Sequence, residues 1–292
     1  MKLLLSLAIL IATTPAFARP PENSAVIPET LSGDYTTAKA MTTLYGSYDE
    51  AKKISTWDVT RQGRFPLSGD GPVNVQILLD ALYYESGVKK HLLFTWARHF
   101  LPGKGANDFD PNTCHACGVV LGFAIFAQAA PGWHLESQKL KWKQLGAWGS
   151  PPNSLTLAEI GENMHAIVIH QADMHQGIFS SYFSAYALRN GQEHALFSEL
   201  TEDFSMVDSR CDQNLRARDN KVSKAQAQKM CSNPEEKIEF VSPPSSTPKQ
   251  TYYDLKLIRT FHGARGIEPV EINDLYTFNN ATMRYARKPA SK

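Results

Sequence analysis

Residues 73–84 read VNVQILLDALYY, and they decide the fold because apolar side chains recur at every second position. This alternation predicts a β-strand in which Val73, Val75, Ile77, Leu79, Ala81 and Tyr83 share one face. The next residues, ESGVKK at 85–90, contain a glycine and predict a turn. The chain then returns as HLLFTWARHF at 91–100, with Leu92, Phe94 and Trp96 in phase. The stretch therefore predicts an antiparallel β-hairpin.

Similar hairpins are predicted along the rest of the chain. GVVLGFAIFAQ (118–128) turns at AAPG and returns as WHLESQKLKW (133–142), although the first arm is apolar on both faces and also fits a short buried helix. Asn190-Gly191 stands between two alternating runs, where a type I′ turn needs positive φ at both central residues. Asn279-Asn280 predicts a further hairpin near the C-terminus, after a strand at 251–261.

Only two segments favour helices, residues 35–53 and residues 220–231. We therefore predict a mainly β fold, an antiparallel meander of roughly ten to twelve strands with one or two short helices, built as a sandwich, a barrel or a propeller-like arrangement. We expect a single β-rich domain over 19–292. A charged excursion at about 208–237 interrupts it between Cys211 and Cys231, and a Pro/Ser-rich connection, SPPSSTPK, follows at 242–249.

The first eighteen residues predict an export signal. Lys2 supplies a positive start, residues 3–12 form an apolar run too short to span a membrane, and Ala16-Phe17-Ala18 fits a cleavage site. We expect a periplasmic or secreted protein whose mature chain begins at Arg19, and no membrane span.

Composition narrows the classes of partner. The chain of 292 residues has a formal net charge of +1, with 42% hydrophobic and 20% charged residues. These values are typical of an ordered globular protein. They give no electrostatic reason to expect nucleic acid as a partner.

The four cysteines, Cys114, Cys117, Cys211 and Cys231, are predicted to form disulfides because an exported protein folds in an oxidising compartment. Three connectivities are open, and sequence proximity favours Cys114–Cys117 with Cys211–Cys231. The segment TCHACG at 113–118 also fits a redox-active Cys-x-x-Cys pair, but it lies among hairpins and precedes a poor helix former. A zinc site made of the four thiolates is a weaker alternative, because the second pair is spaced too widely.

Other candidate chemistry is sparse. Met174 with His170 and His175 combines thioether and imidazole groups, which makes these residues weak candidates for a metal site. His165, in the same stretch, shares a strand face with Ile167 and Ile169. We therefore predict that its side chain is half-buried and packs against its neighbours. The sequence lacks the nucleophile elbow, the H-E-x-x-H zinc motif and the Gly-rich phosphate loop, so it predicts no cofactor.

The leader, CHACGVVLGFAIF (114–126), LGAWGSPP (145–152) and the closing YYDLKLI and LYTF segments together resemble a group of exported bacterial proteins, from about residue 40 to the end. That resemblance implies an exported location and no particular reaction. The sequence thus favours a non-enzymatic exported β protein that binds another macromolecule, such as an inhibitor or immunity-type partner of another protein. The alternative is a thiol-disulfide or metal-handling enzyme centred on Cys114 and Cys117.

The two predicted disulfides should differ in their effect on stability. On the chain-entropy model, a Cys211–Cys231 bond closes about 21 residues and stabilises by about 3.3 kcal/mol, whereas a Cys114–Cys117 bond closes about four and contributes about 1.9 kcal/mol. Thermal unfolding of the two double-serine variants should therefore show the larger loss for Cys211 and Cys231. A disulfide-exchange activity that disappears only in the Cys114/Cys117 variant would instead establish the redox alternative.

Overall fold

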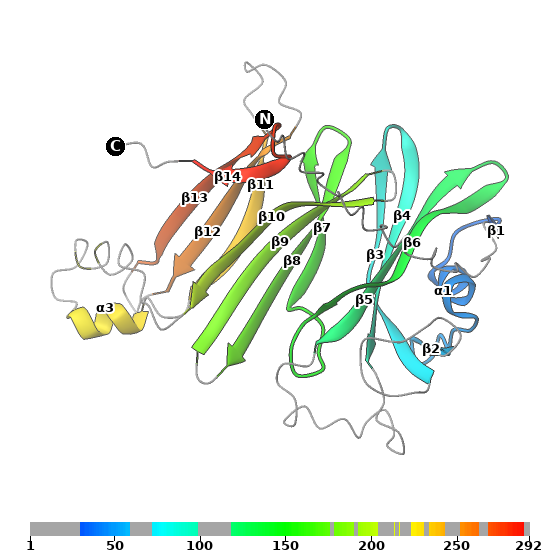
Figure 1. The fold of residues 1–292 in the computed structure, drawn as a ribbon, viewed down its shortest axis with the longest axis horizontal. Coiled ribbons are helices and arrows are strands. Elements are labelled where there is room, and N and C mark those ends of the chain that lie inside the picture. The colour runs from blue at the N-terminus through cyan, green and yellow to red at the C-terminus, as the bar shows by residue number, and fades with distance from the viewer. Residues whose placement is uncertain are drawn as a thin grey trace, which may run out of the picture.

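The computed structural model describes residues 30–58, 72–98, 118–175, 178–189, 192–203, 213, 216, 223–230, 234–242, 252–262 and 268–288. These residues are mostly β, and every strand pairs antiparallel with its neighbours, which confirms the predicted fold class (Figure 1). Fourteen strands are described instead of ten to twelve, partly because the short strands β1 and β2 lie at the edges of one sheet.

The first sheet has six strands in the order β1-β6-β5-β4-β3-β2. Their bounds are β1 (Thr30–Ser32), β2 (Ile54–Asp58), β3 (Pro72–Glu85), β4 (Val88–Arg98), β5 (Val119–Ala129) and β6 (Gly132–Leu145). The predicted hairpins β3–β4 and β5–β6 are both confirmed. Of the two interpretations of residues 118–128, the strand is correct.

The second and third sheets each have four strands. The second has the order β10-β9-β8-β7, with bounds β7 (Ser154–Gly161), β8 (Met164–His175), β9 (Ile178–Arg189) and β10 (Gln192–Asp203). The third has the order β11-β12-β13-β14, with bounds β11 (Glu235–Val241), β12 (Asp254–Phe261), β13 (Val270–Asn279) and β14 (Arg284–Arg287). Asn190-Gly191 lies outside the described residues, but the strands on either side pair as predicted, with Arg189 opposite Gln192.

Two helices with defined bounds lie inside the predicted ranges: α1 (Thr37–Tyr45) and α3 (Lys224–Met230). The start of α1 is fixed by Thr36, whose hydroxyl oxygen accepts a hydrogen bond from the Lys39 amide at 3.2 Å. It ends at Gly46, which has a φ of 86° that favours glycine. Within the part of the chain that the structure describes, no helix is long and apolar enough to cross a membrane.

The elements stack in four layers, with α1 on the first sheet, the second sheet behind it and the third sheet last (Figure 1). A separate hydrophobic core fills each of the three spaces. Strand β5 shows the consequence, because Ala124 and Phe126 face the core under α1 whereas Phe123 and Ile125 face the second sheet. Burial on both sides explains why its sequence is apolar at successive positions.

A β-bulge in β3 overturns one prediction. Leu78 is an extra residue, since Ile77 lies opposite Thr95 and the next paired residue, Leu79, lies opposite Phe94. An inserted residue reverses the alternation of side chains beyond it. The expectation that residues 73–83 place their alternate side chains on one face is therefore wrong. Val73, Val75 and Ile77 pack under α1, whereas Leu79 and Tyr83 pack toward the second sheet.

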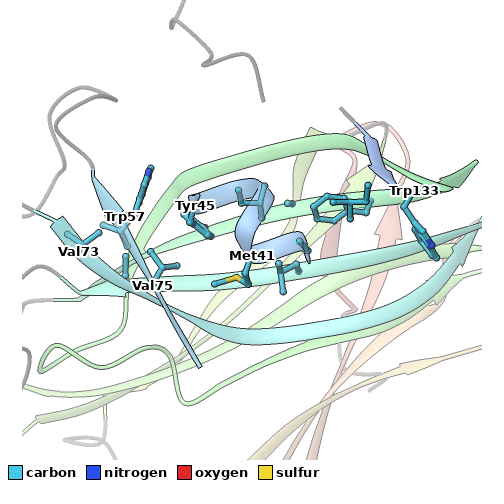
Figure 2. Close-up of a cluster of buried hydrophobic side chains, with 14 residues drawn as sticks. Met41, Tyr45, Trp57, Val73, Val75 and Trp133 are labelled. Atoms are coloured by element: carbon cyan, nitrogen blue, oxygen red, sulfur yellow. The ribbon is translucent and has the colours of Figure 1, made fainter. Parts of the chain in front are cut away.

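Helix α1 is held mainly by its apolar face. Met41 and Tyr45 point onto the first sheet among Val73, Val75 and Trp57 (Figure 2). Met41 is fully buried, and a nine-residue helix is too short to be stable alone. The sheet therefore supplies most of the stability of α1.

Replacement of Met41 by alanine should lower the free energy of unfolding by about 2–5 kcal/mol, because it leaves a cavity under α1. Thr42→Ala, at an exposed position of the same helix, is the matched control and should change it by less than about 0.5 kcal/mol. Urea unfolding of both variants measures the difference. Equal, small effects would show that α1 is not part of the cooperative core.

Candidate functional site

The outer half of the β3–β4 hairpin carries the side chains from which a site can be built. Strand β2 pairs with β3 only from Pro72 to Gln76, so residues 77–85 form an edge with no strand partner on that side among the described residues. Because of the bulge, Asp80, Leu82 and Tyr84 lie on the face toward α1, whereas Tyr83 lies on the face toward the second sheet.

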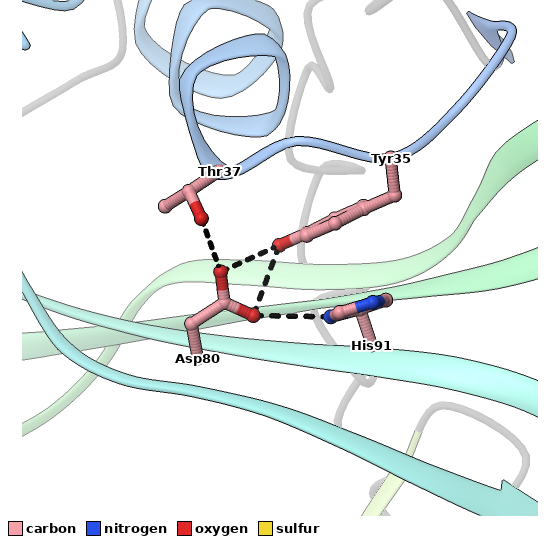
Figure 3. Close-up of polar contacts among 4 residues, drawn as sticks. All are labelled: Tyr35, Thr37, Asp80 and His91. Atoms are coloured by element: carbon pink, nitrogen blue, oxygen red, sulfur yellow. Dashed lines mark hydrogen bonds and ion pairs between the residues drawn. The ribbon is translucent and has the colours of Figure 1, made fainter.

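Asp80 is the centre of a polar cluster at the start of α1 (Figure 3). Its carboxylate accepts a hydrogen bond from the Thr37 hydroxyl at 2.6 Å and from the Tyr35 hydroxyl at 3.3 Å, and it contacts Nδ1 of His91 at 3.1 Å. The Tyr35 ring stacks on the His91 ring, with 3.7 Å between centroids. Two segments far apart in the sequence, the start of α1 and the β3–β4 hairpin, thus meet at one carboxylate.

This cluster fits an anchor better than a reaction centre. Burial, with the neighbouring Asp80 charge, raises the pKa of Tyr35, so its hydroxyl stays protonated and donates. The Thr37 hydroxyl is directed at the carboxylate and not at the imidazole, whereas a nucleophile must be in contact with its base. The arrangement fastens the start of α1 to the first sheet.

A pocket of about 470 Å³ lies on the other side of the hairpin. It is bounded by the outer part of β3 and by the β7–β8 hairpin of the second sheet. Its walls are formed by Leu82, Tyr83, Tyr84, Leu157, Glu159, Asn163 and His165. The lining thus combines apolar side chains with polar ones, and convergent polar groups in a pocket can orient a bound molecule.

Two polar groups of this pocket have no hydrogen-bond partner in the described part of the chain: the hydroxyl of Tyr83 and Nδ1 of His165. Tyr83 is only 5% exposed, and its ring centroid lies 5.1 Å from that of His165. Burial raises the pKa of Tyr83 and lowers the pKa of His165, which favours the neutral form of each. Since a buried polar group without a partner is costly, both can serve a bound molecule as hydrogen-bonding groups.

Carboxylates surround these two groups. Glu159 lies opposite His165 in the β7–β8 register and accepts a hydrogen bond from the Tyr253 hydroxyl at 3.1 Å. Farther in, the Lys90 ammonium lies 2.6 Å from Glu85 and 2.7 Å from Glu136. Burial lowers the pKa of Lys90, but hydrogen bonds to both carboxylates outweigh it and leave the pKa raised. The surroundings of Tyr83 and His165 thus hold three carboxylates, Glu85, Glu136 and Glu159, and the ammonium of Lys90.

Apolar side chains are exposed beside the pocket. Leu82 is 48%, Tyr84 52% and Val88 39% exposed, and all three lie at the tip of the β3–β4 hairpin. Single exposed apolar residues are ordinary, but a group of them bordering a pocket is typical of an interaction surface.

The predicted cysteine chemistry cannot be placed on this geometry. Cys114, Cys117, Cys211 and Cys231 all lie outside the described residues, as does most of the predicted excursion at 208–237. The disulfide pairing and the redox alternative therefore stay predictions. The described parts of the excursion include α3 and the first residues of β11.

The histidines of β8 are placed in part. His165 is half-buried and faces the core that contains Ile167 and Ile169, as predicted. Among the three weak metal candidates, Met174 and His175 lie on β8, but their side chains are outside the described set. His170 faces the third sheet, where its Nε2 lies 2.8 Å from the Ser181 hydroxyl and its ring stacks on Phe183.

The described residues hold no group of three or more His, Cys, Asp or Glu side chains arranged for a metal ion.

The pocket was not predicted from the sequence, because Tyr83, Glu159 and His165 come from three strands and form no motif. The local signal in the sequence is Tyr84, an aromatic residue at a position that the alternation of residues 73–83 assigns to the other face. Comparison of the chain with known proteins finds no matching family model, no matching curated protein and no matching solved structure.

Lowering the pH should destabilise the protein partly by protonating two half-buried histidines, His165 and His170. Burial lowers the pKa values of His165 and His170, so the unfolded chain binds protons more readily than the folded one. Stability is then complete above the unfolded value of about 6.5 and is lost as the pH falls below it. In urea unfolding at about pH 7.5 and about pH 5.5, the His165→Gln/His170→Gln variant should lose less stability on acidification than the parent. His194→Gln, at an exposed position, should behave like the parent, and an unchanged pH dependence in the double variant would contradict the assignment.

Proposed function

We propose that this protein is an exported, non-enzymatic binding protein whose partner is another protein, in the manner of an inhibitor or an immunity-type partner. The export signal predicted from the first eighteen residues supports the location. The partner surface is the outer end of the β3–β4 hairpin together with the pocket beside it.

One observation carries the proposal: exposed apolar side chains border a pocket whose buried polar groups have no partner among the described residues. Leu82 and Tyr84 supply apolar area, and the Tyr83 hydroxyl and His165 Nδ1 supply directional hydrogen bonds. Protein interfaces combine these features, with aromatic anchors near the centre and polar groups that fix the register.

The chemistry of the pocket supports binding over catalysis. The ammonium of Lys90, which lies near the pocket, is engaged by two carboxylates. A lysine nucleophile needs a lowered pKa, whereas these carboxylates raise that of Lys90. These groups are therefore better suited to holding a partner than to attacking a substrate.

Replacement of Leu82 and Tyr84 together by serine should abolish capture of the partner, because truncation of anchors in an interface typically costs more than about 2 kcal/mol. The measurement is chemical cross-linking in extracts of the exported compartment, followed by reconstitution with the purified partner. Tyr182→Ser, which removes another tyrosine of similar exposure from β9, is the matched control and should capture normally. Equal capture by all three proteins would refute this surface.

A further inference from the structure

The free edge of β3 adds a second kind of recognition to this surface. Among the described residues, no strand pairs with residues 77–85 on the side that β2 leaves after Gln76. An open edge presents main-chain N–H and C=O groups in the spacing of a β-strand. Only a polypeptide in extended conformation matches that spacing, so the edge selects a peptide segment over a small molecule.

The charge beside the edge selects the side chain. Glu159 is exposed at the pocket wall, and Glu85 and Glu136 together outnumber the single ammonium of Lys90. The carboxylates beside the pocket are therefore complementary to a cation. Leu157 lines the same pocket, and it can pack against the methylene stem of a long basic side chain.

The buried polar groups of the pocket are also complementary to a basic side chain. The Tyr83 hydroxyl can accept a hydrogen bond from an ammonium or a guanidinium, and so can Nδ1 of a neutral His165 in the tautomer that leaves it unprotonated. The ring of Tyr83 offers an aromatic face to the same cation. A single basic side chain can therefore contact the carboxylate, the apolar wall and the buried polar groups of the pocket.

Building on the proposed function, we propose that the partner contributes an extended basic segment, which pairs with the outer edge of β3 and places a lysine or arginine side chain in the pocket beside Glu159. The segment is anchored by main-chain hydrogen bonds, and its basic side chain fixes the register. The apolar tip formed by Leu82 and Tyr84 lies against the neighbouring part of the partner.

The test uses the mature full-length protein and three synthetic peptides. The first is the peptide Thr-Val-Thr-Lys-Thr-Val-Thr with an amidated carboxyl end and a fluorophore attached through an amide to its amino end. The second has norleucine in place of lysine, which keeps the stem and removes the charge. The third is the lysine peptide N-methylated at alternate residues, which blocks pairing with a strand edge.

Fluorescence anisotropy should show binding of the lysine peptide with a Kd below about 1 mM and no measurable binding of the N-methylated peptide. The norleucine peptide should bind about fivefold more weakly, the upper range for one exposed ion pair. Glu159→Gln should weaken the lysine peptide to the level of the norleucine peptide and leave the norleucine peptide unchanged. Glu271→Gln, which removes an exposed carboxylate from the third sheet, should alter neither.

Several outcomes would overturn the inference: no binding of the lysine peptide, equal binding of the N-methylated peptide, or an equal effect of Glu159→Gln on both unmethylated peptides. The proposed function can survive such a result. If the peptide experiment gives one of these results while the Leu82/Tyr84 variant loses its partner in the capture experiment, the hairpin surface is supported and the basic segment is ruled out. If the Leu82/Tyr84 variant retains the partner, both proposals are ruled out.

Discussion

The whole architecture depends on burying the central strands of the first sheet on both faces. Strands β4 and β5 are apolar at successive positions, and neither face can be left to water. Helix α1 covers one face and the second sheet covers the other. The second sheet then has its own outer face to bury, which the third sheet covers. The four layers follow from this single requirement, repeated from sheet to sheet.

The sequence predicts those parts of the fold that are encoded locally. The alternation of residues 73–84 and the turn at 85–90 predict the β3–β4 hairpin, and the asparagine-rich turn at 279–280 predicts the pairing of β13 with β14. The doubly apolar run at 118–128 left strand and helix both open, because its burial comes from α1 and the second sheet, which lie elsewhere in the chain. The bulge at Leu78 was missed for a similar reason. Its neighbours are all apolar, so the change of face leaves no mark on the pattern.

The candidate site was less accessible to sequence reasoning than the fold. The sequence predicts candidate sites at Cys114, Cys117 and the methionine–histidine stretch that contains His170, Met174 and His175, because these residue types carry recognisable chemistry. The pocket instead joins Tyr83 from the first sheet with Glu159 and His165 from the second, and only the packing of two sheets brings them together. The bulge contributes here as well. It directs Asp80 toward the start of α1 and Tyr83 toward the second sheet, so one hairpin serves an anchor on one face and a pocket on the other.

The position of α1 in the chain has a consequence for the order of folding. Residues 30–45 are synthesised before the surface that they cover, which is built from β3 to β6 and is complete only when residue 145 has been added. Strand β1 likewise pairs with β6, about a hundred residues later. Closing such a long loop before the sheet exists costs chain entropy, and no packing contacts are yet present to offset that cost. The leading segment must therefore remain unstructured until the hairpins have assembled, and its docking through Asp80 closes the fold instead of starting it.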